Sequence, residues 1–133
     1  ARKGEGAFVG CTPIRVSEQR FLDRCTTATE LHAGSPLERH PLLRSDFLQK
    51  VGNARMLGST CLGMAYAAAG RVDLAFYLQT NPWDVAAGSL LVTEAGGSAR
   101  SWGGAFLATS QGDIIAGNSM LVDQFCEVFA PEK

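Results

Sequence analysis

Several features that would point to a common class of protein are missing from this 133-residue chain. It has no excess of charge of either sign, because 12 Lys and Arg residues stand against 13 Asp and Glu residues. A positive field that would bind the phosphate backbone of nucleic acid is therefore not expected. No apolar run approaches the roughly 18 residues of a membrane-spanning helix, and the first residues do not resemble a signal peptide, so we expect no membrane contact.

The chain also lacks the spacings of a zinc site, a redox motif or a catalytic triad. No C-x-x-C pair occurs, and the four cysteines lie far apart. Reduced thiols in a cytoplasmic protein are the simplest interpretation, and two disulfides stay open as an alternative. The two histidines have no Ser or Cys nucleophile at a recognisable spacing, so they are expected on surface loops. These residues are Cys11, Cys25, Cys61, Cys126, His32 and His40.

The residues that are present predict one α/β domain. Hydrophobic residues make up 46% of the chain and charged residues 19%, which is enough apolar material for a core. Strand and helix patterns alternate, so we expect a mixed β-sheet of about five strands covered by helices on both faces. The predicted strands are 7–9, 14–16, 24–31, 54–57, 72–78, 97–101 and 114–116. The predicted helices are 41–51, 59–69, 82–95 and 120–129, with a loop at 33–36.

The segment from Asn81 to Gly97 is the most informative. Its apolar residues at 83, 86, 87, 90, 91 and 95 have helical spacing and predict a stripe that faces a core. Pro82 suits the first turn and the glycines at 96 and 97 suit the exit, so Asp84 lies at the helix N-terminus. Free backbone N–H groups stabilise a carboxylate there. Two interpretations stay open: Asp84 only caps the helix, or it also ligates a hard cation such as Mg²⁺.

Residues 83–97 read Trp-Asp-x-Ala-Ala-Gly-x-Leu-Leu-x-x-Glu-Ala-Gly-Gly. This string resembles the C-terminal signature of the inositol monophosphatase family, a group of Mg²⁺-dependent, Li⁺-sensitive phosphatases of inositol and sugar phosphates. Three further segments agree with the family in order and spacing: 3–17 with its central hairpin, 55–73 with its next strand–helix–strand unit, and 113–118 with its last strand. The resemblance implies the fold of that family's C-terminal domain.

The resemblance also implies a set of site residues. Asp84 corresponds to a metal ligand, and the turn Gly58, Ser59 and Thr60 corresponds to one that contacts substrate hydroxyls. Simple helix capping is the alternative for Ser59. Tyr77 stands where animal members have a Glu that bonds the inositol ring, which leaves the phosphorylated substrate open. A packed aromatic at a strand end is the alternative for Tyr77.

Most of the family's metal ligands have no counterpart in this sequence. They lie in an N-terminal half that contains an Asp-Pro-x-Asp-Gly-Thr motif, and no such motif occurs here. No initiator Met precedes Ala1. We therefore expect the C-terminal portion of a longer protein, with residues 1–17 as the hairpin at the junction and 18–133 as the C-terminal domain. A gene that encodes only this half is the alternative.

The expected function is thus part of a Mg²⁺-dependent phosphomonoesterase that acts on an inositol phosphate or a related small sugar or polyol phosphate. This chain would supply one ligand of the complete enzyme's Mg²⁺ and the substrate-side wall, and alone it should be inactive. Its expected partner is the missing N-terminal half or a second copy of the chain, in a homo-oligomer with residues 7–16 near the contact. The alternative function is a non-catalytic module that keeps the fold for oligomerisation or ligand binding.

Overall fold

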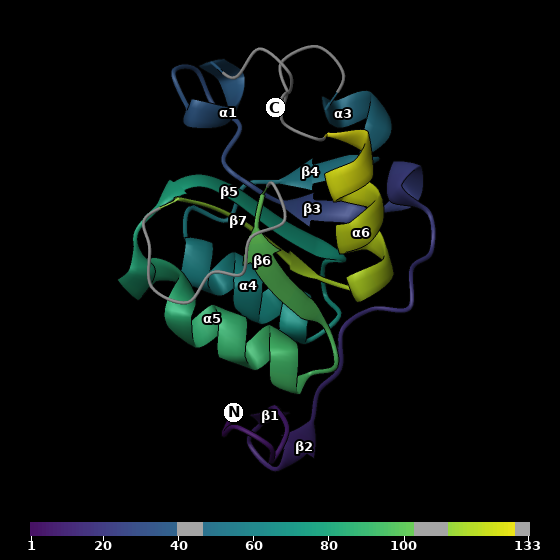
Figure 1. Ribbon diagram of the computed structural model, residues 1–133, viewed down its shortest axis with the longest axis vertical. Helices are drawn as coiled ribbons and strands as arrows, with labels where there is room; N and C mark the ends of the chain where they lie inside the picture. Colours follow the sequence, from purple (N-terminus) through teal and green to yellow (C-terminus); the bar gives the residue numbers. More distant parts are fainter. Residues whose placement is uncertain (40–46, 103–111, 130–133) are drawn as a thin grey trace.

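The structure is a computed structural model that describes residues 1–39, 47–102 and 112–129. Figure 1 shows a central sheet with helices on either side and a small hairpin at one end. The strands are β1 Phe8–Val9, β2 Thr12–Pro13, β3 Thr26–Ala28, β4 Asn53–Arg55, β5 Leu74–Thr80, β6 Ser98–Ser101 and β7 Gly112–Gly117. The helices are η1 Leu22–Arg24, α1 Pro36–Arg39, α3 Phe47–Lys50, α4 Thr60–Ala68, α5 Pro82–Glu94 and α6 Ser119–Val128.

The five-stranded sheet has the order β4-β3-β5-β7-β6 and is mixed. β3 pairs in parallel with both β4 and β5, whose connections pass through helices. β7 pairs antiparallel with β5 and β6. The predicted fold class, a mixed sheet of about five strands flanked by helices, is confirmed.

Alternate residues of the central strands build two separate hydrophobic cores. Ala75 and Tyr77 of β5 join the core beneath α4 and α5, whereas Leu74 and Phe76 join the core beneath α3 and α6. Successive side chains of a strand point to opposite faces, so β5 and β7 are buried on both sides. The sheet is therefore the middle layer between two helix layers (Figure 1).

The core beneath α6 is aromatic. The rings of Phe76 and Phe125 lie 4.6 Å apart, and Phe47 and Phe129 pack against them. The indole N–H of Trp102, which is 8% exposed, donates to the carbonyl of Phe129 at 2.7 Å. Trp102 therefore packs within this core.

Both ends of α4 and of α5 follow local signals. Ser59 caps α4 by accepting from the backbone N–H of Leu62 at 3.2 Å, and Gly70 follows its C-terminus with φ +67°. Asn81 and Pro82 begin α5, and Gly96 follows its end with φ +84°. These conformations are the left-handed exits that glycine favours.

The predicted inner stripe of α5 is wrong for most of its positions. Trp83 is 75% exposed and Leu90 is 36% exposed, and both alanines at 86 and 87 are exposed. Val85, Gly88 and Val92 are the α5 residues buried against the sheet and α4. Periodicity failed here because α5 is apolar on both sides, so it does not single out one inner face.

Several other predicted boundaries differ from those of the structure. The second hairpin strand is at Thr12–Pro13 rather than 14–16, and β5 begins two residues later than predicted. The predicted loop at 33–36 ends in a helix, α1, that starts at Pro36. Of the helix predicted at 41–51, α3 is the part described; residues 40–46, with His40, lie outside the described residues.

The N-terminal hairpin is attached to the end of α5. The carboxylate of Glu94 accepts from the backbone N–H groups of Gly4 at 2.8 Å and Gly6 at 2.9 Å. These charge-assisted bonds hold the pKa of Glu94 below its ordinary value. β1 and β2 form a sheet of their own (Figure 1), and their assignment to a junction between two halves stays a prediction.

Two further expectations concern membranes and thiols. In the ranges that the structure describes, none of the helices has both the length and the apolar character needed to cross a bilayer. All four cysteines are free thiols. Burial raises the pKa of Cys25 to about 11, so this thiol stays protonated near neutral pH.

Candidate functional site

A small polar cavity of about 160 Å³ lies where the end of β5 meets the N-termini of α4 and α5. Three of the five predicted site residues line it: Thr60, Tyr77 and Asp84. They come from three elements and are brought together only by the fold. The described residues that line it are Thr29, Glu30, His32, Pro36, Leu37, Thr60, Tyr77, Leu78, Gln79, Thr80 and Asp84.

Asp84 caps its own helix with one carboxylate oxygen. Its Oδ2 accepts from the backbone N–H and the side-chain amide of Asn81, both at 3.2 Å. Among the described residues its Oδ1 has no hydrogen-bond partner. The capping interpretation is therefore correct, and it leaves one oxygen available for a ligand.

The turn before α4 contributes less of the cavity than predicted. Thr60 lines it, whereas Gly58 and Ser59 are not among its described lining residues. Gly58 has a φ of +67°, a left-handed conformation that positions the turn. The hydroxyl of Ser59 is engaged in capping α4. A substrate role for these three residues stays a prediction.

Tyr77 is a buried wall of the cavity, with 2% of its surface exposed. Its hydroxyl donates a long 3.4 Å bond to the carbonyl of Ser59, which links β5 to the turn before α4. Burial, and then the nearby Glu30 charge, raise the pKa of the phenol above its ordinary value. Tyr77 is thus neutral near pH 7. The packing interpretation is supported, and the phenol oxygen can accept a hydrogen bond at the cavity.

Sequence reasoning missed most of the other cavity residues, among them Glu30, His32 and Gln79. Glu30 and His32 follow β3, and His32 Nε2 lies 3.7 Å from a Glu30 oxygen. His32 is exposed as predicted, but it borders the cavity. Gln79 adopts a left-handed φ of +56° in the irregularity between Tyr77 and Thr80, and its N–H donates to Asp113 at 2.9 Å. No local pattern signals that conformation, because Gly, Asn or Asp usually adopts it.

The described residues do not by themselves fit a magnesium site. Mg²⁺ requires near-octahedral oxygen ligands, and it is usually held by one or two carboxylates together with water and substrate phosphate. Within the described parts of the chain, no group of three or more His, Cys, Asp or Glu side chains could hold an ion. Asp84 can therefore be one ligand of a site completed by other groups.

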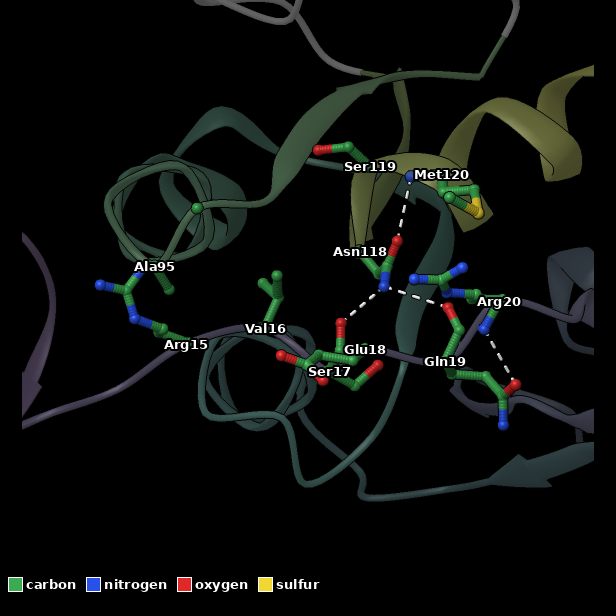
Figure 2. A pocket seen from close by; sticks show the side chains of 11 residues that line it. Arg15, Val16, Ser17, Glu18, Gln19, Arg20, Ala95, Asn118, Ser119 and Met120 are labelled. Carbon is green, nitrogen blue, oxygen red and sulfur yellow. Dashed lines mark hydrogen bonds between the residues drawn. The ribbon is translucent and has the colours of Figure 1, made fainter.

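A larger pocket of about 460 Å³ lies on another part of the molecule, between residues 15–20 and the start of α6 (Figure 2). Asn118 joins its two sides. The Asn118 amide nitrogen donates to the carbonyls of Ser17 at 2.5 Å and Gln19 at 3.1 Å, and its oxygen caps α6 by accepting from Met120 N–H at 3.0 Å. This pocket contains none of the predicted site residues. Its polar groups serve to fix the chain before η1 against α6.

The strand order and the helix layers on both faces define an α/β protein with a mixed five-stranded sheet. The chain belongs to the inositol monophosphatase family, whose sequence profile matches residues 1–131.

Individual relatives agree with this assignment. A Neisseria meningitidis protein named putative Nus factor SuhB is 33% identical over 132 residues, or 98% of this chain and 51% of that relative. A Thermotoga maritima fructose-1,6-bisphosphatase/inositol-1-monophosphatase is 34% identical over 128 residues, or 96% of this chain and 48% of that relative. The crystal structure of the extragenic suppressor protein suhB from Bartonella henselae matches with a TM-score of 0.86 at 32% identity, covering 100% of this chain and 52% of that chain. The chain thus spans about half the length of the relatives it matches.

Proposed function

We propose that this chain supplies one metal ligand and the substrate-side wall of a Mg²⁺-dependent phosphomonoesterase. The substrate would be an inositol phosphate or a related small sugar or polyol phosphate. The observation that carries the proposal is the cavity itself, where Asp84 at a helix N-terminus meets Thr60 and Tyr77. The name of the Thermotoga maritima relative supports the same chemistry.

The chain's own groups suit binding and orientation more than turnover. Asp84 lies at the N-terminus of α5, where its Oδ2 is hydrogen-bonded to Asn81, and its Oδ1 is available to a hard cation. Thr60 and the neutral phenol of Tyr77 offer hydroxyls to a polyol. Mg²⁺, when bound, would neutralise phosphate charge, but the remaining carboxylates have to come from elsewhere. Gly58 and Ser59 would hold the turn that presents Thr60.

The test is hydrolysis by a completed protein. The part of the Thermotoga maritima relative that this chain does not match is fused before Ala1, and Mg²⁺-dependent release of phosphate from inositol 1-phosphate is measured. Asp84→Asn should lower kcat at least about 100-fold, since an amide is a poorer ligand for a hard cation. Asp23→Asn, at an exposed carboxylate outside the cavity lining, is the matched control and should change little. Equal rates in both variants would refute the role of Asp84.

A second candidate function is a non-catalytic module that keeps the fold for oligomerisation or ligand binding. One observation favours it: the Neisseria meningitidis relative is named a putative Nus factor rather than a phosphatase. In that case the fused protein would bind inositol 1-phosphate or a partner without releasing phosphate. The Asp84→Asn variant would then release as little phosphate as the unchanged protein.

A further inference from the structure

Two hydroxyl groups of β5 that line the polar cavity already use their protons inside the protein. The Tyr77 hydroxyl donates to the carbonyl of Ser59 at 3.4 Å, and the Thr80 hydroxyl donates to the carbonyl of Gly112 at 2.7 Å. Both side chains are buried. A hydroxyl has one proton, so each of these oxygens can only accept a hydrogen bond from a ligand. The β5 wall of the cavity therefore suits a ligand that donates hydrogen bonds.

Glu30 adds a charged acceptor beside this wall. It follows β3, which pairs with β5, and after burial its charge is the second cause that raises the pKa of the Tyr77 phenol. Within residues 1–39, 47–102 and 112–129 its carboxylate accepts no hydrogen bond, and its ion-pair partner is His32 Nε2 at 3.7 Å. The Glu30 side chain is 34% exposed, and a partly exposed pair at this distance is weak. Both carboxylate oxygens thus remain available to a ligand.

The charges of the described lining do not suit a second phosphate group. It contains two carboxylates, Glu30 and Asp84, and His32, whose Nε2 faces Glu30, but no Lys or Arg. The charge of one phosphate would be compensated by the Mg²⁺ that Asp84 helps to hold under the proposed function. A second ionised phosphate has acceptor oxygens only, so it would meet the acceptors Tyr77 and Thr80 and be repelled by Glu30. The cavity therefore suits one phosphate and several hydroxyl groups.

We propose that Glu30 is the specificity-determining residue of this cavity and selects a polyol monophosphate over a bisphosphate. The inference rests on the proposed function, in which the reacting phosphate binds beside Asp84. Hydroxyl groups of the polyol then donate to Glu30, and the oxygens of Tyr77 and Thr80 serve as neutral acceptors. An ionised carboxylate has two acceptor oxygens, so it can accept from two neighbouring hydroxyls at once.

Equilibrium binding tests the proposal without turnover. The Thermotoga maritima fusion is titrated by calorimetry in the presence of Ca²⁺, a hard cation that takes oxygen ligands. The ligands are inositol 1-phosphate, fructose 1,6-bisphosphate and ethyl phosphate, which has no free hydroxyl on its carbon chain. We expect inositol 1-phosphate to bind at least about tenfold more tightly than either of the others, because it alone makes the charge-assisted bonds to Glu30 without a second phosphate. Equal or tighter binding of the bisphosphate would overturn the proposal.

A variant of Glu30 identifies the residue responsible. Glu30→Gln should weaken the binding of inositol 1-phosphate at least about tenfold, leave ethyl phosphate unchanged, and leave the bisphosphate unchanged or bound more tightly. Glu127→Gln, on the exposed side of α6, is the matched control and should change none of the three affinities. A merely structural role of Glu30 would weaken all three ligands together. That result, or unchanged binding of inositol 1-phosphate in Glu30→Gln, would contradict the proposal.

The binding result is independent of hydrolysis. Selection that depends on Glu30, in a fusion that releases no phosphate, supports the specificity role and contradicts the proposed function. Hydrolysis that depends on Asp84, with the same ligand preference in Glu30→Gln as in the unchanged fusion, does the reverse. A fusion that does not bind inositol 1-phosphate contradicts the specificity role whatever its activity.

Discussion

Gly63→Ala provides a test of how Tyr77 is held at the cavity. Replacing glycine by alanine in the middle of a helix normally stabilises it by about 1 kcal/mol. At Gly63, however, an added Cβ would lie 2.0 Å from the Tyr77 hydroxyl oxygen and 2.9 Å from the ring carbon that carries it. Tyr77 is in a buried strand and has little room to move. Overpacking of this kind costs about 1–3 kcal/mol, and the helix gain offsets about 1 kcal/mol of it, so we expect the free energy of unfolding to fall by up to about 2 kcal/mol.

The clash can be separated from other effects by a double-mutant cycle. Tyr77→Phe removes the hydroxyl that makes the closest contact, and alone it should cost only about 0.5 kcal/mol because the bond to Ser59 is long. In that background Gly63→Ala should cost at least about 1 kcal/mol less than in the original chain. Urea unfolding followed by circular dichroism gives the four free energies. A stabilising Gly63→Ala, or equal costs in both backgrounds, would refute the placement of Tyr77 against α4.

Two further predictions concern titratable groups. Because the folded pKa of Glu94 is depressed, its stabilising effect is present above the ordinary Glu pKa of about 4.3 and is lost as pH falls through the lower folded value. The protection factors of the Gly4 and Gly6 amides, measured by NMR and corrected for the intrinsic pH dependence of exchange, should therefore fall in acid. Glu94→Gln should lower both protection factors already at pH 7. Protection factors that are independent of pH would contradict the contact. Cys61 is exposed and should react with a disulfide reagent near pH 8 well before the buried, protonated Cys25, and equal rates would show that Cys25 is accessible.

Sequence reasoning succeeded where the determining interactions are local. Ser59 and Asn81 are the N-cap residues of α4 and α5, and Gly70 and Gly96 follow the ends of these helices, as their residue types predict. These caps depend on hydrogen bonds to neighbours in the chain. The placement of Asp84 at a helix N-terminus follows from the same local information.

The rest depends on contacts between distant segments. Glu30 reaches the cavity because β3 lies next to β5, and Gln79 reaches it through an irregular pairing of β5 with β7. Neither pairing is encoded in the residues near those positions. The inner side of α5 could not be predicted for a different reason. Trp83 and Leu90 are as apolar as the residues of α5 that are buried, so the distribution of apolar residues around the helix does not indicate which side faces the core.

The central claim is that Asp84 is a metal ligand, and paramagnetic NMR on the isolated chain tests it most directly. Mn²⁺ takes the same carboxylate ligands as Mg²⁺ and broadens the signals of nearby amides. On titration with millimolar Mn²⁺, the amides of residues 81–86 should broaden first, and Asp84→Asn should abolish this effect while Asp23→Asn leaves it intact. Broadening centred on another part of the chain, or unchanged in Asp84→Asn, would contradict the account.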